Sequence, residues 1–204
     1  MKMRSLGWVI AIGAMVGCQP EPTKPEQSAA LVQPGDGVTI VAGQQPDNIQ
    51  KALMLSAKEA LFSALSNKLM QAMSEGPANA IEVCQREASE IATEVGNFHQ
   101  VKIGRTGVRL RNSSNQAPHW AKDWIESRTE EPQFAVLSNQ SAAALLPIKL
   151  QPQCVMCHGP ADQILPEIKK QLVDRYPNDQ AVGFQPGELR GWFWVELPTS
   201  AASK

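Results

Sequence analysis

The stretch QPQCVMCHGPAD, residues 151–162, contains two cysteines separated by two residues and followed at once by a histidine. This C-x-x-C-H spacing is the attachment signature of c-type haem. The thiols of Cys154 and Cys157 can each add across one vinyl group of the porphyrin, and the imidazole of His158 can then bind the iron. The motif therefore predicts one covalently attached haem c, with His158 as its proximal ligand.

Two other uses of closely spaced cysteines fit this sequence less well. A thioredoxin-like redox pair belongs in a βαβ unit, which the residues around 154–157 do not suggest, and it would leave the histidine unexplained. A structural zinc site needs a second pair of ligands, and the sequence has no further C-x-x-C or H-x-x-x-H spacing. Haem attachment is therefore the preferred interpretation.

Covalent attachment of haem in bacteria takes place outside the cytoplasmic membrane, so an export signal is expected. Residues 1–17 have a short basic start and an apolar run that is too short to span a bilayer. The run ends in MVGC, which resembles the bacterial lipobox, although Met15 stands where leucine is usual. We expect Cys18 to be acylated and Gln19 to direct the protein to the outer membrane, facing the periplasm. Cleavage to a soluble periplasmic protein is the alternative.

Composition divides the rest of the chain into a linker, one domain and a tail. Residues 18–46 are rich in proline and glycine and contain no aromatic residue, which indicates a flexible tether. Residues 47–198 are enough for one compact domain, and 199–204 form the tail. The net charge of −1 argues against nucleic acid as a partner and leaves the lipid as the only membrane contact.

A long amphipathic helix is predicted over residues 47–76, and Asp47 with Gln50 would begin it as a capping box. Its expected apolar stripe consists of Ile49, Leu53, Ala57, Leu61, Leu65, Leu69 and Met73. The length of this helix would also allow it to pack against a copy of itself in a homodimer. A second helix is predicted over residues 77–95, with Pro77 in its first turn and Gly96 at its end.

The second half of the domain is predicted to be richer in strands. FAVLS, AAALLPIKL and GWFWVEL read as strands, whereas HWAKDWIESR and PEIKKQLVDRY read as short helices. In the last strand the residues of one face are Trp192, Trp194 and Glu196, and those of the other face are Phe193, Val195 and Leu197. Helices followed by successive strands indicate an α+β fold with an antiparallel sheet.

The fourth cysteine, Cys84, lies on the apolar face of the second helix and would be a free thiol in an oxidising compartment. It could be a buried apolar side chain, or it could be the distal ligand of the iron. The residues alone leave these two interpretations open. Other distal candidates are Met70 and Met73, whose spacing is typical of a helix core, and His99 and His119, which lie at helix ends.

A family resemblance bears on this choice. From about residue 75 to 198 the chain resembles a family of PAS-like haem c domains, through the segments GPANAIEVC, GRTGVRLRNSSN, CVMCHG and YPNDQAVGFQPGELRG. The resemblance implies a five-stranded antiparallel sheet flanked by helices, and it implies His158 and Cys84 as the two axial ligands. The chain departs from the usual pattern at Gly107, where serine is common, and at Ser113, where proline is common.

The predicted ligands indicate what the iron would do. A thiolate favours Fe(III), so the reduction potential should be low, and release of the thiolate on reduction would open a site for CO or NO. Arg105, Arg109 and Arg111 could pair with the haem propionates, because guanidinium binds carboxylate in a bidentate manner. A solvated loop face is the alternative for these arginines.

Together these features predict a periplasmic mono-haem c-type cytochrome that transfers electrons or senses redox state with an unidentified partner. The alternative is a haem-based gas or redox sensor that signals through a separate protein. An enzyme is not expected, since a second haem motif is lacking and six-coordinate iron would leave no open site.

Overall fold

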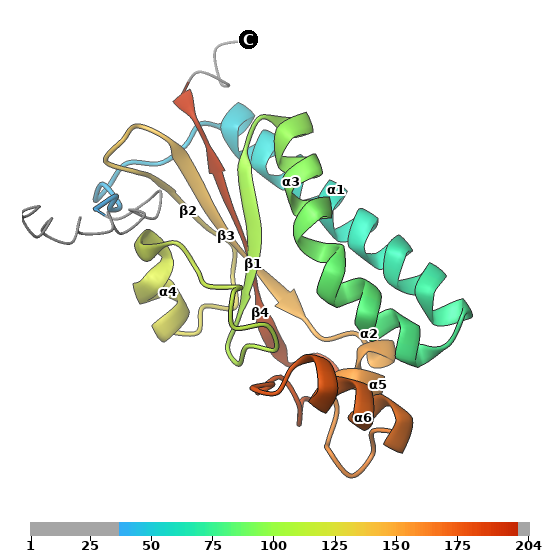
Figure 1. The fold of residues 1–204 in the computed structure, drawn as a ribbon. Helices are drawn as coiled ribbons and strands as arrows, with labels where there is room; N and C mark the ends of the chain where they lie inside the picture. The colour runs from blue at the N-terminus through green and yellow to red at the C-terminus, as the bar shows by residue number, and fades with distance from the viewer. Residues whose placement is uncertain (1–36, 200–204) are drawn as a thin grey trace, which may run out of the picture. The chain divides into compact units, whose positions relative to one another are not determined.

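The computed structural model describes residues 37–199. The expected signal peptide, Cys18 and most of the expected linker and tail lie outside the described residues. Figure 1 shows that the described residues form an α+β domain in which helices cover both faces of an antiparallel sheet. This confirms the fold class predicted from the sequence. Within residues 37–199 no helix combines the length and apolar character needed to cross a membrane.

The first helix, α1 (Asn48–Ser74), begins where the sequence predicted. The Asp47 side chain accepts a hydrogen bond from the Gln50 amide, and the Gln50 side chain accepts one from the Asp47 amide, so the capping box is present. The predicted stripe is correct in the middle of α1 but wrong at its start, where Ile49 is 69% exposed. Residues spaced by four advance about 40° beyond a full turn, so a strict stripe winds off the buried face.

The predicted second helix is two helices in the structure, α2 (Pro77–Arg86) and α3 (Ala88–His99). Pro77 occupies the first turn of α2 as predicted. Glu87 separates the two helices with φ −100° and ψ −19°, and both helices pack against α1. Cys84 therefore lies on a helix of only ten residues that is distinct from α3.

Gly96 does not end the helix, contrary to the sequence prediction. It is buried inside α3, which continues to His99 and ends at Gln100 with a left-handed φ of 55°. A Cβ on Gly96 would lie 2.8 Å from the carbonyl oxygen of Val101. Glycine is thus required here by the close return of the chain after the helix.

The sheet has the strand order β1-β4-β3-β2, with antiparallel pairing throughout. Its strands are β1 (Lys102–Gly107), β2 (Gln133–Val136), β3 (Ala142–Lys149) and β4 (Leu189–Leu197). The family resemblance implied five strands, whereas the sheet formed by residues 37–199 has four. At the outer edge of β2 the described chain has a single bridge, Ile40 to Leu137, beside a 2.9 Å hydrogen bond from the Val41 amide to the Val136 carbonyl. The turn at Gly43, with φ 76°, ends this short pairing.

The paired segment at residues 38–41 had been assigned to the flexible linker by composition. Val38 and Ile40 pack against a buried cluster that includes Leu137, so the ordered chain begins before residue 47. The linker was predicted from the average composition of a proline-rich segment. That average hides the short apolar pattern of GVTIVAG, which is the part that pairs with the sheet.

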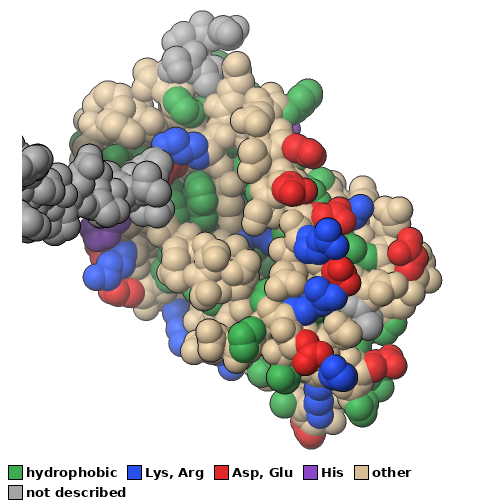
Figure 2. Space-filling view, viewed as in Figure 1, with side chains coloured by type: hydrophobic (Ala, Val, Ile, Leu, Met, Phe, Trp, Pro, Cys, Tyr) green, Lys and Arg blue, Asp and Glu red, His purple; other side chains and the backbone are tan. Residues whose placement is uncertain are grey.

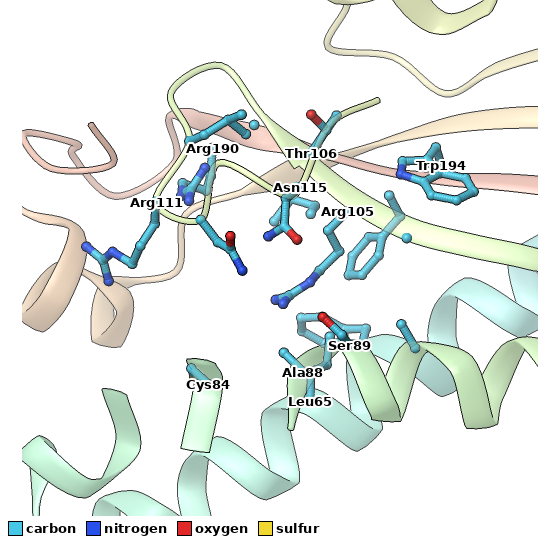
Figure 3. Close-up of a pocket in the computed structure, with 18 of the residues that line it drawn as sticks. Leu65, Cys84, Ala88, Ser89, Arg105, Thr106, Arg111, Asn115, Arg190 and Trp194 are labelled. Carbon is cyan, nitrogen blue, oxygen red and sulfur yellow. The ribbon is translucent and has the colours of Figure 1, made fainter. Parts of the chain in front are cut away.

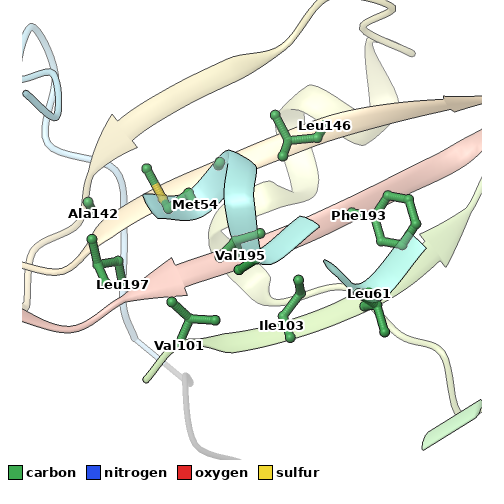
Figure 4. Packing of buried hydrophobic residues seen from close by; sticks show 11 residues of the cluster. Met54, Leu61, Val101, Ile103, Ala142, Leu146, Phe193, Val195 and Leu197 are labelled. Atoms are coloured by element: carbon green, nitrogen blue, oxygen red, sulfur yellow. The ribbon is translucent and has the colours of Figure 1, made fainter. Parts of the chain in front are cut away.

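The two faces of β4 carry the side chains that the sequence predicted for them. Phe193, Val195 and Leu197 contact Met54 and Leu61 of α1 in the main core (Figure 4). Trp192 lies in the cluster on the opposite face. That cluster is covered by η1 (His119–Ala121) and α4 (Lys122–Glu126), and the Trp120 indole donates a 2.7 Å hydrogen bond to the buried Glu196 carboxylate.

The C-x-x-C-H motif lies in two short helical turns, η2 (Pro152–Cys154) and α5 (Val155–His158), directly after β3. Helix α6 (Pro166–Arg175) follows and packs against α2. Figure 2 shows positive and negative side chains next to one another on the helical side of the domain. The ion pairs of the helices include Lys68–Glu87, Arg86–Glu82 and Lys170–Asp174.

Candidate functional site

A cavity of about 440 Å³ lies where helices α1 to α3 face strand β1 and the C-x-x-C-H segment. This size is typical of a site for a small molecule or cofactor. Phe62, Leu65 and Leu69 of α1 and Phe193 of β4 supply apolar walls. Figure 3 shows Cys84 on one side of this space and Arg105 pointing into it from β1.

Cys84 reaches this cavity from α2. Its side chain is exposed because it faces the cavity, so the interpretation of Cys84 as a buried core residue is wrong. Protein atoms around the cavity nevertheless limit its contact with bulk water. This burial raises the pKa of the Cys84 thiol, while the positive charges of Arg105 and Arg111 act in the opposite direction.

His158 faces the same cavity with its tautomer fixed. Its Nδ1 lies 2.7 Å from the carbonyl oxygen of Ala181, and because a carbonyl can only accept, Nδ1 carries the proton and donates. Burial, aided by the charges of Arg111 and Arg190, lowers the pKa of His158 well below its ordinary value. The imidazole is therefore neutral with Nε2 as its free acceptor, which is the form that binds a metal ion.

The other two cysteines of the motif lie beside this histidine. Cys154 ends η2 and lines the cavity, whereas Cys157 of α5 is half-buried against Ile81 and the α6 residues around it. Burial raises the pKa of the Cys157 thiol, while the positive charge of Arg111 acts in the opposite direction. The fold thus brings Cys84 close to the C-x-x-C-H segment, although the two are far apart in the sequence.

The three arginines singled out from the sequence have different surroundings. Arg105 lines the cavity and makes no hydrogen bond or ion pair with another residue among 37–199, and burial lowers its pKa. Arg111 also lines the cavity, but its Nε lies 2.9 Å from the Asp179 carboxylate and its Nη2 donates to the Cys157 carbonyl. Arg109 lies over the Phe184 ring, 4.0 Å from its centre, and is not a lining residue.

Arg190 is a fourth arginine, which the sequence analysis missed. It lies at the start of β4, lines the cavity and donates a 3.0 Å hydrogen bond to the Arg109 carbonyl. Burial lowers the pKa of Arg190 to about 10. Its Nε and the Trp194 indole Nε1 are buried without a hydrogen-bond partner among the described residues. Its place in the segment GELRG, which had been matched to the family, was the available signal.

The other distal candidates are not brought to the cavity. Met70 is 62% exposed on α1, and Met73, His99 and His119 are also absent from the lining residues. Among the distal candidates considered from the sequence, Cys84 is therefore the donor that shares the cavity with His158.

Fold and site together define the class: a PAS-like α+β domain whose cavity holds a thiol and an imidazole supplied by separate elements. The chain belongs to the Tll0287-like family, whose model matches residues 40–198. This confirms the resemblance to PAS-like haem c domains predicted from residues 75–198 and extends it to α1. A search of curated proteins found no match.

Among solved structures the chain is similar to one described as the crystal structure of the cyanobacterial heme-protein Tll0287. The two share 21% identity with a TM-score of 0.54, and the match covers 76% of this chain and 98% of that chain. At this level of identity the similarity supports the fold.

Proposed function

We propose that this protein is a periplasmic mono-haem c-type cytochrome, with haem attached through Cys154 and Cys157 and with His158 and Cys84 as axial ligands. The observation that carries the proposal is that Cys84 and His158, from distant parts of the sequence, line one cavity beside the two attachment cysteines. The similar structure is that of a heme-protein, which agrees with the C-x-x-C-H motif.

The residues of the cavity fit haem in three respects. The neutral His158 with a free Nε2 is a suitable nitrogen donor, and the Cys84 thiol is accessible from the cavity. Phe62, Leu65 and Phe193 offer apolar surface to a porphyrin ring. The partly buried arginines without an anionic partner suit carboxylate groups.

Arg105 and Arg190 are the proposed propionate partners. Arg105 has no hydrogen bond or ion pair among residues 37–199, and Arg190 has an unsatisfied Nε. Arg111 already pairs with Asp179, so its proposed role is to fix the C-x-x-C-H segment through the Cys157 carbonyl. Arg109, on the Phe184 ring, would act at the rim of the site.

The chain's residues would set the redox behaviour. Bound haem supplies a one-electron Fe(III)/Fe(II) couple whose potential depends on its axial ligands and surroundings. Cys84, bound as a thiolate, would favour Fe(III), and the Ala181 carbonyl would orient His158 and increase its basicity. A low potential follows, which suits electron transfer or redox sensing with a separate protein. With both Cys84 and His158 bound, the iron would have no position left for a substrate, so we propose a non-enzymatic role.

A gas or redox sensor is the second candidate. The interruption at Glu87 favours it, because it lies three residues after Cys84 and separates α2 from α3. Release of the Cys84 thiolate on reduction would open a site for CO or NO, and a shift of α2 at this break is the movement that we propose a separate partner would detect.

The first test compares the purified protein with Cys84→Ala. Mass spectrometry should show one covalently bound haem in both proteins, and ferric absorption and electron paramagnetic resonance spectra should show thiolate ligation only in the parent. Met70→Ala is the matched control, because Met70 is an exposed sulfur donor outside the cavity. Identical spectra for the parent and Cys84→Ala would contradict the proposed ligation.

The parent protein and Cys84→Ala can also be used to distinguish the two candidate functions. Both proteins would be reduced and exposed to CO, and the rate of electron exchange with a soluble cytochrome would be measured for each. CO binding by the reduced parent would favour a sensor, whereas fast exchange without CO binding would favour electron transfer.

A further inference from the structure

Tyr176 is the single tyrosine of the chain and has no role in the site described so far. It follows the last residue of α6, and its side chain is 8% exposed. Its ring packs in a buried cluster with Ile81 of α2 and with Ile168 and Leu172 of α6. Tyr176 is also one of the residues that line the cavity.

The Tyr176 hydroxyl makes no hydrogen bond to any other residue among 37–199. A tyrosine with a largely buried ring usually bonds its hydroxyl to a partner, and because Tyr176 lines the cavity, a group in the cavity can supply one. Burial and the nearby Cys84 raise the pKa of Tyr176 to about 12. The hydroxyl therefore remains protonated near neutral pH and can act as a donor.

Contacts between α2 and α6 hold Tyr176 near the part of α2 that carries Cys84. Ile81, one turn before Cys84 on α2, lies in the same buried cluster as Tyr176. The Gln85 side chain donates a 2.9 Å hydrogen bond to the Arg175 carbonyl, so the residue after Cys84 is bonded to the residue before Tyr176.

We propose that the Tyr176 hydroxyl donates a hydrogen bond to the Cys84 sulfur and thereby sets how strongly that sulfur favours ferric iron. The inference rests on the proposed ligation by Cys84. A hydrogen bond to a thiolate stabilises negative charge on the sulfur and weakens its donation to the metal, so the reduction potential is higher than it would be without the bond.

The test is the midpoint potential of the haem-loaded Tyr176→Phe variant. This change removes only the hydroxyl and keeps the ring in its apolar cluster, so the fold should be retained, as circular dichroism would verify. The ferric–ferrous equilibrium should shift about tenfold towards ferric, which is about 59 mV for a one-electron couple. An unchanged potential would overturn the proposal.

Repeating the change in the Cys84→Ala background makes the test specific. If the hydroxyl acts through the sulfur, Tyr176→Phe should then have no effect on the potential. An equal shift in both backgrounds would mean that Tyr176 acts on another part of the site, and the proposal would be wrong. Failure of the ligation itself would be seen separately, as identical spectra for the parent and Cys84→Ala.

A second substitution at Tyr176 should change the midpoint potential in the opposite direction. Because the chain has one tyrosine, 3-fluorotyrosine can be incorporated at position 176 alone. The fluorinated phenol is more acidic and is a stronger donor, so the potential should rise. A fall or no change would contradict a hydrogen bond to the sulfur.

Discussion

At the scale of single residues, the arginines of the cavity differ in whether another protein group already binds them. Arg111 is neutralised by Asp179 at 2.9 Å, whereas Arg105 and the Nε of Arg190 have no partner among the described residues. Buried donors without partners are unfavourable, so their presence around one cavity points to an anionic ligand. This difference, and not the number of arginines, identifies the candidates for propionate binding.

Replacing Arg190 tests this assignment. Arg190→Met should lower the midpoint potential by on the order of 30–60 mV, because loss of a nearby positive charge disfavours Fe(II). Arg109→Met is the matched control, since Arg109 is exposed, stacks on the same Phe184 ring and is not a lining residue. Potentiometric titration of both variants measures the difference, and equal shifts would remove the special role of Arg190.

At the scale of secondary-structure elements, the position of Cys84 depends on the contact between α2 and α6. Arg175 of α6 donates to the Glu82 carboxylate at 2.5 Å and to the Gln85 side chain at 3.3 Å. These residues flank Cys84 on α2. Because α6 follows the C-x-x-C-H segment, this contact links the two elements that would hold opposite sides of the haem.

Removal of the link should disturb the distal ligand. Arg175→Met should lower the free energy of unfolding by only about 1 kcal/mol, because the ion pair is partly exposed. It should also produce a second ferric species in the electron paramagnetic resonance spectrum. Arg86→Met is the control, since Arg86 pairs with the same Glu82 from an exposed position without contacting α6. A single parent-like species in Arg175→Met would show that the contact does not position Cys84.

Local patterns explain which elements could be predicted from the sequence. The capping box at Asp47 and the alternation in β4 depend on neighbours within a few residues, and both were predicted correctly. The break at Glu87 and the burial of Gly96 depend on packing against α1 and on the return of Val101, which no local pattern contains. Sequence reasoning therefore failed where tertiary contacts decide the structure.

The same distinction applies to the site. The C-x-x-C-H motif carries its chemistry in its own spacing, so His158 could be proposed at once. Whether Cys84 was a core residue or a ligand depended on the space in front of α2, which only the fold defines. Tyr176 and Arg190 lie in the segment YPNDQAVGFQPGELRG, which was matched to the family, but nothing in their residue types or spacing assigned them a role before the cavity was known.

At the scale of the whole molecule, the proposed membrane anchor lies outside residues 37–199 and is tested separately. The expected lipid on Cys18 should retain the protein in the membrane fraction of bacterial cells. Cys18→Ala should move most of it to the soluble fraction if export continues, while the haem spectrum stays unchanged. Fractionation with haem staining measures this. Equal membrane retention of both proteins would rule out lipid on Cys18 as the anchor.

The strand order has a consequence for biogenesis. Among residues 37–199, β1 pairs only with β4, which also joins β1 to β3 and follows them both in the sequence. A chain still emerging from the ribosome therefore lacks the strand on which the sheet is assembled. Premature folding is disfavoured until β4 has been made, and the cysteines at 154 and 157 are made before that point. We expect the nascent chain to remain competent for translocation and its thiols to stay accessible for haem attachment.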